Sequence, residues 1–107
     1  MFARFGWTEG DAESLERAVG AYEATIVPEV SKVDGFRGTF ACVDRSNGRA
    51  VVVTLWRDEE AMSAHERLTA PRFIAQAVEA SGLTVPTVDR YEVVLWNMES
   101  ASEAEGA

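Results

Sequence analysis

The stretch TFACVDRSNGRAVVVTLWR, residues 39–57, decides the fold that this sequence predicts. Two runs rich in β-branched and aromatic residues flank Asn47-Gly48, which favours a two-residue type I′ hairpin turn because both residue types tolerate positive φ. A turn of this kind fixes the register of the strands, so Ser46 is expected to pair with Arg49. One side of the sheet would then pair Cys42 with Val53, Phe40 with Leu55 and Asp44 with Val51.

Neither side of this hairpin carries many polar side chains. The opposite side would pair Val43 with Val52, Ala41 with Thr54 and Thr39 with Trp56. Antiparallel strands usually expose one polar face to water, and neither face here is polar. We therefore expect helices on one face and a second subunit on the other. Cys42, the only cysteine, is expected to be a small core residue, and a lone cysteine excludes an internal disulfide.

The segments before the hairpin predict a strand and a helix. Residues 2–7 are predicted to form a short strand, and Asp11 is a plausible N-cap for the helix that follows. The apolar face of this helix is expected to carry Leu15, Val19, Tyr22 and Ile26. Pro28 should kink or restart it, because proline lacks the amide hydrogen and clashes with the preceding turn.

The segments after the hairpin predict a second helix in two pieces and a last strand. Asp58 is the expected N-cap, and Ala61, Met62, His65 and Leu68 share the predicted inner face. Pro71 begins the second piece, which buries Phe73, Ile74, Ala77 and Val78 and ends at Gly82. Residues 88–97 form the last predicted strand.

The order of these elements is β-α-β-β-α-β, which predicts an α+β fold of the ferredoxin-like type with an antiparallel four-stranded sheet. Residues 1–98 are expected to form one domain, since the chain has only 107 residues. Residues 99–107 are small, polar and acidic, and we expect them to be a disordered tail.

Composition excludes several classes of function. The formal net charge of −8 argues against a nucleic-acid module, because phosphates are neutralised by clustered Lys and Arg, and an anionic membrane would repel this chain too. Without a long apolar run or a signal-peptide pattern, the protein is expected to be soluble and cytoplasmic. A single histidine and scattered carboxylates offer no metal-ligand spacing, so we expect no metal site.

Three segments together resemble the antibiotic biosynthesis monooxygenase-like superfamily of dimeric α+β barrels. They are PEVSKVDGFRG, VVVTLWRDEEAMSAHE and the later YEVV, and the resemblance spans residues 2–96. Its best markers are Gly35-Phe36 at a strand entry and Trp56 followed by an acidic helix cap. The resemblance implies a homodimer whose two sheets form a barrel, with a pocket between the sheet and the helices of each subunit.

The residues of the family's active members are only partly present. Relatives that oxidise anthrone-like polyketides without a cofactor are expected to carry Asn and Tyr shortly before the strand-three Trp, where this chain has Val52 and Val53. Haem-degrading relatives use a strand-one Asn, a helical Trp and a later His. His65 stands at the helical Trp position and Ala75 about where the haem-ligating His would be. We therefore expect no haem, flavin or metal cofactor.

Trp56 and His65 are the leading candidate site residues. An imidazole titrates near neutrality and could act as a catalytic base, and a buried indole could stack on a flat aromatic ligand. The alternatives are a core Trp and a satisfied core or rim His. The expected further walls of a substrate-binding pocket are Tyr22, Phe5, Trp7 and Met62.

Charged residues within the strands need partners. Arg4, Arg90 and Glu92 are expected to form an ion pair between the first and last strands, or across a dimer.

Two candidate functions follow from the composition, the predicted fold and the resemblance. One is a cofactor-independent monooxygenase acting on a small aromatic or polyketide-like substrate. The alternative is a non-catalytic dimeric α+β barrel that binds a small hydrophobic ligand.

Overall fold

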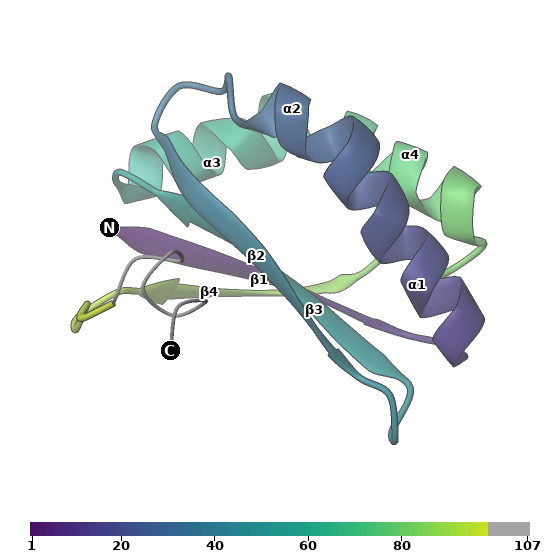
Figure 1. Cartoon of the computed structure of the whole chain (residues 1–107). Helices are drawn as coiled ribbons and strands as arrows, with labels where there is room; N and C mark the ends of the chain where they lie inside the picture. Colours follow the sequence, from purple (N-terminus) through teal and green to yellow (C-terminus); the bar gives the residue numbers. More distant parts are fainter. Residues whose placement is uncertain (99–107) are drawn as a thin grey trace.

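The computed structural model describes residues 1–98, so the predicted tail at 99–107 lies outside the described residues. Its elements follow the predicted order (Figure 1). They are β1 (Phe2–Glu9), α1 (Ala12–Ala21), η1 (Tyr22–Ile26), α2 (Val27–Val30), β2 (Phe36–Asp44), β3 (Arg49–Trp56), α3 (Glu59–Leu68), α4 (Ala70–Ser81) and β4 (Thr87–Glu92). None of the helices among these residues is long and apolar enough to cross a membrane.

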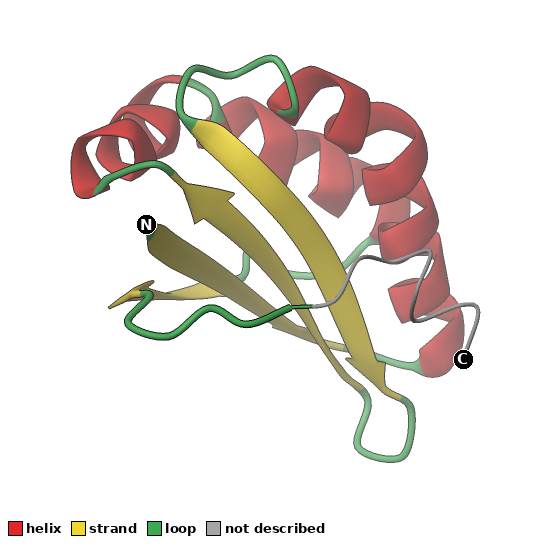
Figure 2. Ribbon diagram, turned by 60° about the vertical axis from the view of Figure 1, so that its left-hand side comes forward, coloured by secondary structure: helices red, strands yellow, loops and turns green. Residues whose placement is uncertain are grey.

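The four strands form one antiparallel sheet in the order β2-β3-β1-β4. All the helices lie over the same face of this sheet, and the other face is left without a helix (Figures 1 and 2). The predicted ferredoxin-like arrangement is therefore confirmed. The helix-side core contains Trp56, Met62 and Phe73, whereas Ala3, Val53 and Leu55 form a separate cluster on the face without helices, which we call the open face.

The register of the β2–β3 hairpin differs from the prediction by two residues. Asp44 pairs with Arg49, Cys42 with Val51 and Phe40 with Val53, so residues 45–48 form a four-residue loop. A type I′ turn needs positive φ at both central residues, but Asn47 does not adopt it and instead donates hydrogen bonds from its backbone N and Nδ2 to Asp44. Because the shift is an even number of residues, every side chain keeps its predicted face.

Several side chains of the open face are more exposed in this single chain than the side chains of a core would be. Cys42 is exposed, so the expectation that it is a core residue is wrong for one subunit, and Phe40 beside it is 46% exposed. β2 is an edge strand of the sheet. An apolar face of this kind is unusual on a soluble monomer and commonly marks an interaction surface.

The first helix continues without a break through Pro28 because it changes its winding. Tyr22–Ile26 form a π-helical segment, and Pro28 then lies in the first turn of α2, where its missing amide hydrogen costs little. Asp11 caps α1 as predicted by accepting a hydrogen bond from the Ser14 backbone N at 2.8 Å. The π-helical turn brings Tyr22 and Ile26 over the sheet.

The second helix is divided at Thr69, close to the predicted break. Asp58 accepts a hydrogen bond from the Ala61 backbone N at 2.8 Å, which confirms the predicted cap, and Gly82 ends α4 with φ 75°. The inner-face prediction fails for Leu68, which is 74% exposed, because α3 ends there and the chain turns into α4.

The last strand ends earlier than predicted. β4 has only β1 as a neighbour, and Glu92 already pairs with Phe2 at the beginning of β1. One more hydrogen bond, from the Val93 backbone N to the Met1 carbonyl oxygen at 2.8 Å, closes the ladder. Beyond it the apolar side chains of Val94, Leu95 and Trp96 are exposed.

Candidate functional site

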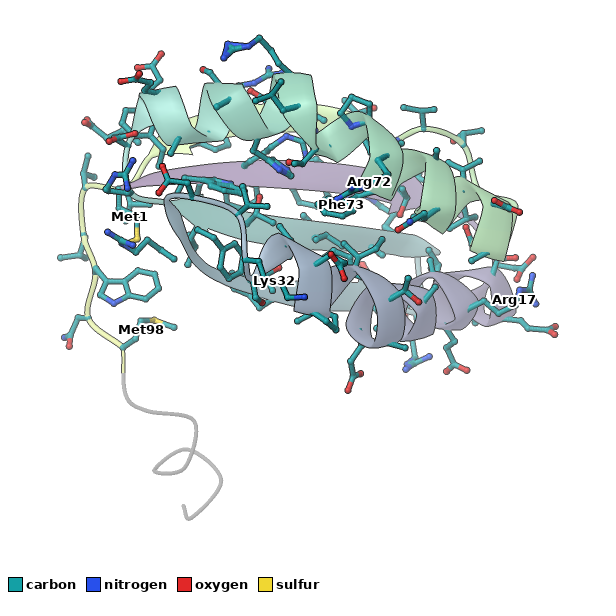
Figure 3. All side chains as sticks on the ribbon, turned by 90° about the horizontal axis from the view of Figure 1, so that it is seen from above. Met1, Arg17, Lys32, Arg72, Phe73 and Met98 are labelled. Carbon is teal, nitrogen blue, oxygen red and sulfur yellow. The ribbon has the colours of Figure 1, made fainter. Side chains whose placement is uncertain are left out.

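A cavity of ≈ 110 Å³ lies between the sheet and the helices. Its walls are mainly apolar and include Ile26, Ile74 and Val78, with a few polar groups that converge on it, as is typical of ligand sites. Phe73 of α4 lies over the sheet between the helices and forms part of the same lining (Figure 3). A second depression of ≈ 350 Å³ is larger, but Asp34, Arg57 and Glu60 line it and it lacks this apolar enclosure.

The sheet gives the cavity a polar end and an apolar end. Arg4 pairs with Thr54 across β1 and β3, and Thr54 pairs with Thr39 of β2, so these side chains form one polar row. The next row on the same face contains Gly6 and Val52. Both rows line the cavity through Arg4, Thr54, Gly6 and Val52. Because glycine has no side chain, the space above Gly6 extends up to Pro86, whose Cβ would lie 3.8 Å from a Cβ at this position.

Trp56 lies behind this cavity and does not line it. The indole is fully buried, and its Nε1 donates a hydrogen bond to Thr54 Oγ1 at 3.0 Å. Its ring stacks on the His65 imidazole, with centroids 4.4 Å apart and planes inclined by 24°. The alternating pattern of β3 directs Trp56 to the helix side, where α3 covers it. Trp56 thus contacts His65, which lines the cavity, but does not line the cavity itself.

His65 lines the cavity from α3 and is only 4% exposed. Its Nδ1 lies 2.6 Å from Thr69 Oγ1, so the imidazole has an orienting partner one helical turn later. Burial, together with the positive charge of Arg4 and against the opposing effect of Glu66, lowers the pKa of His65 from 6.5 to about 4. The imidazole is therefore uncharged at neutral pH.

The arginines of β1 and β4 form ion pairs with a glutamate of α3. The expected ion pair between the two strands is therefore wrong for the single chain. Arg4 and Arg90 are neighbours across β1 and β4, and both contact Glu66 of α3. Arg4 Nε lies 3.1 Å from Glu66 Oε2, and Arg90 Nη2 lies 2.6 Å from the same oxygen. Burial raises the pKa of Glu66, but hydrogen bonds from Arg90 and Arg4 outweigh it and hold the pKa below its ordinary value. Glu66 therefore remains ionised and fixes Arg4 at the polar end of the cavity.

Tyr22 reaches the same end of the cavity from the π-helical segment. Its hydroxyl lies 2.6 Å from Thr39 Oγ1, and Thr39 Oγ1 in turn donates to the Val53 carbonyl oxygen at 2.8 Å. Burial raises the pKa of Tyr22, against the opposing hydrogen bond of Thr39, so the phenol stays neutral. Tyr22 thus offers a fixed polar atom among apolar neighbours.

The predicted site residues fall into three groups. Tyr22 and His65 line the cavity, while Trp56 and Met62 belong to the helix-side core behind it. Phe5 and Trp7 lie on the open face with Val51 and Val53, because alternate residues of β1 point away from the helices. The expected floor of Phe5 and Trp7 is instead formed by Arg4 and Gly6.

Several residues of the site were not predicted from the sequence. Thr54 and Gly6 were not singled out, although the alternation of β1 and β3 puts them on the helix side. Glu66 and Thr69 follow His65 by one residue and by one helical turn. The charged mid-strand residues Arg4 and Arg90 were the sequence signal that a partner such as Glu66 was needed. Within residues 1–98 no three His, Cys, Asp or Glu side chains come together as a metal site.

Comparison with known proteins gives a match to a family and to several solved structures. The model of the antibiotic biosynthesis monooxygenase family matches residues 1–73. SnoaB of Streptomyces nogalater, a cofactor-independent oxygenase, is similar with a TM-score of 0.66 and 15% identity, over 92% of this chain and 97% of that one. The ActVA-Orf6 monooxygenase of Streptomyces coelicolor, solved with the ligand nanaomycin D, gives a TM-score of 0.68 and 14% identity over 92% and 91% of the two chains. At these identities the structures establish a shared fold only.

A relative in sequence comes from Mycobacterium tuberculosis. The uncharacterized protein Rv2557 is 27% identical over 107 residues, which cover 100% of this chain and 46% of that protein. The chain thus spans about half the length of the curated relatives that it matches.

Proposed function

Because the chain belongs to the antibiotic biosynthesis monooxygenase family, we propose that its cavity binds a small aromatic or polyketide-like compound and promotes its oxidation by O2 without a cofactor. The observation that carries this proposal is His65, an uncharged imidazole at the wall of a mainly apolar cavity. An apolar cavity removes water from the reacting groups, and a fixed base can take a proton from them.

The proposed reaction needs no reductant other than the substrate. His65 accepts a proton from an activated CH2 group of the substrate, and the resulting carbanion transfers electrons to O2. A C–O bond forms, and loss of water from the hydroperoxide breaks the O–O bond and leaves a carbonyl group. The sum is CH2 + O2 → C=O + H2O, in which four electrons pass from carbon to oxygen.

Arg4 is proposed to stabilise the substrate anion. Its Nε donates the hydrogen bond to Glu66, and the terminal nitrogens of the guanidinium have no hydrogen-bond partner within residues 1–98. A bound anion would raise the pKa of His65, because opposite charges favour the protonated imidazole, and would thereby assist proton transfer. Fixed positive charge beside a developing anion is a common source of rate enhancement.

The size of the cavity limits the substrate. Its ≈ 110 Å³ is comparable with the roughly 150 Å³ cavities that hold one benzene ring, and well below the roughly 300–1,000 Å³ of drug-sized pockets. A single ring, or one edge of a larger flat compound, is therefore the part we expect to enter. This favours small substrates over extended polycyclic ones.

The second candidate is a non-catalytic binding protein. The observation in its favour is also at His65, since a pKa of about 4 makes the free imidazole a weak base and its Nδ1 is already hydrogen bonded. In that case Trp56 and His65 form a structural stack, and the cavity holds a small hydrophobic ligand without changing it.

Oxygen consumption distinguishes the two candidates. Protein dialysed against chelator would be mixed with hydroxyarenes and activated cyclic ketones of one, two and three rings, and O2 uptake would be followed with an electrode. We expect uptake above the uncatalysed rate, greatest for one-ring or two-ring compounds. Binding of these compounds without any O2 uptake would exclude oxidation and support the binding protein.

We also propose that the protein is a homodimer formed through the open face. Support comes from the apolar cluster around Val53, from the partly exposed Phe40, and from the apolar residues that follow β4, of which Leu95 is 83% exposed. A second copy would cover this surface and build a barrel from two sheets. Phe5 and Trp7 would then pack inside the barrel.

A further inference from the structure

Thr69 makes two contacts with His65, but its hydroxyl group has only one hydrogen. Thr69 Oγ1 lies 3.1 Å from the His65 carbonyl oxygen, which can only accept, and 2.6 Å from His65 Nδ1. If the hydroxyl donates to the carbonyl oxygen, Nδ1 must donate to the hydroxyl. Only this arrangement makes both contacts hydrogen bonds, and it assigns the imidazole hydrogen to Nδ1.

The other ring nitrogen then carries a lone pair. Nε2 has no hydrogen-bond partner within residues 1–98. Among these residues every fully buried side-chain nitrogen or oxygen has a partner, so Nε2 is not fully buried. Thr69 lines the outer depression and does not line the cavity, whereas His65 lines both. Because Thr69 lies on the side of the outer depression, this arrangement points to the ring edge remote from Thr69, which includes Nε2, as the edge that reaches the cavity.

Tyr22 is fixed in the same way by a second threonine. Thr39 uses its one hydroxyl hydrogen for the Val53 carbonyl oxygen, so the 2.6 Å contact with Tyr22 requires the phenol to donate to Thr39. The Tyr22 oxygen can then only accept a further hydrogen bond. Two cavity-lining groups on the helix side are thus hydrogen-bond acceptors, each because a threonine passes its own hydrogen to a backbone carbonyl.

We propose that Thr69 is a positioning residue that holds His65 in the Nδ1–H tautomer, so that His65 Nε2 accepts a hydrogen from the ligand in the cavity. The proposal deepens the oxidation function and rests on it for its role in turnover. It also specifies the ligand, which must carry a hydrogen-bond donor or an acidic hydrogen on the side that faces α3 and the π-helical segment.

The tautomer can be observed directly. His65 is the only histidine, so a long-range 1H–15N correlation spectrum of the labelled protein contains one imidazole. At pH 7, well above a pKa of about 4, we expect the pattern of the Nδ1–H tautomer. Observation of the Nε2–H tautomer, which free histidine favours, would overturn the proposal. Because the spectrum requires no turnover, a protein that shows Nδ1–H but consumes no O2 would lose the oxidation function and keep this assignment.

Two variants of Thr69 form a matched pair. Thr69→Val keeps the shape of the side chain and removes the hydroxyl, whereas Thr69→Ser keeps the hydroxyl. We expect Thr69→Val to shift the imidazole toward Nε2–H and Thr69→Ser to retain Nδ1–H. The same tautomer in both variants would mean that Thr69 does not determine it, even if both proteins fold normally.

Phenol and anisole test the ligand side, because they differ in the O–H donor. One net hydrogen bond is worth about 1 kcal/mol, so the wild-type protein should bind phenol about 5-fold more tightly than anisole by NMR titration. The preference should vanish in Thr69→Val and persist in Thr69→Ser. Equal affinities in the wild type, or binding of neither compound, would overturn the ligand specificity proposed here.

Discussion

The indole of Trp56 and the imidazole of His65 stack with their ring centroids 4.4 Å apart, so the histidine has an apolar aromatic surface on one side and the cavity beyond it. This contact explains much of the chemistry of His65. Stacking and burial exclude water from the ring, which disfavours the charged imidazolium and lowers the pKa to about 4.

The lowered pKa of His65 predicts a loss of stability in mild acid. In the pH range between about 4 and 6.5 the unfolded chain binds the proton more readily than the folded chain, so the free energy of unfolding falls as the pH falls through this range. From pH 7 to pH 5 we expect a loss of about 2 kcal/mol in urea unfolding. The same measurement on His65→Phe, which keeps an aromatic ring, should show almost no loss, and an equal loss in both proteins would contradict the assignment.

Trp56→Phe should destabilise the protein by about 2 kcal/mol, because it leaves a gap beside His65 and removes the hydrogen bond to Thr54. Leu68→Ala is the control, since that apolar side chain is 74% exposed and lies at the end of α3, away from the open face. Chemical denaturation at pH 7 should show a change of less than about 0.5 kcal/mol for the control. Similar effects of the two substitutions would argue against a core role for Trp56.

Glu66→Gln should cost about 1–2 kcal/mol, because it leaves the guanidinium of Arg4, with a side chain only 12% exposed, without a carboxylate. Glu13→Gln removes the same charge from an exposed pair with Arg17 and should change stability by less than about 0.5 kcal/mol. The comparison is made by thermal and urea unfolding at low salt. If Glu66→Gln changed the stability as little as Glu13→Gln, the ion pairs of Arg4 and Arg90 with Glu66 would not stabilise the fold.

Phe40→Lys should convert the proposed homodimer to a monomer, because it introduces a charge at the open face. Leu68→Lys is the matched control, since Leu68 is also an exposed apolar residue but lies at the end of α3 on the helix side. Sedimentation at micromolar concentration should give twice the chain mass for wild type and Leu68→Lys. A monomeric wild-type protein would refute the dimer.

Most of the fold could be predicted from local patterns. Asp58 and Gly82 set helix ends through caps that depend on nearby residues only, and the alternation of β3 correctly put Val52, Thr54 and Trp56 on one face of the sheet. The hairpin register could not be predicted, because it depended on whether Asp44 or a positive φ at Asn47 would close the loop. The result was a four-residue loop in place of a two-residue turn.

The site was harder to predict because it depends on contacts between distant residues. His65 and Tyr22 were identified from helical spacing, which is local. The pairing of Arg4 with Glu66 joins residues that are 62 positions apart, and no spacing rule indicates it. Phe5 and Trp7 were assigned to the pocket for their aromatic character, but their strand positions put them on the open face, whereas Arg4 and Gly6, which alternate with them, line the cavity.

The most direct test of the account is the removal of a proton by His65 in the absence of O2. The probe is 2-tetralone, whose CH2 group between the aromatic ring and the carbonyl is acidic, and deuterium uptake at that carbon would be measured by NMR under argon in D2O buffer. We predict that the wild-type protein accelerates this exchange and that His65→Ala, once shown to be folded, lowers the rate about 10²–10⁴-fold, the usual contribution of a general base. Equal exchange rates for the two proteins would contradict the central role given to His65.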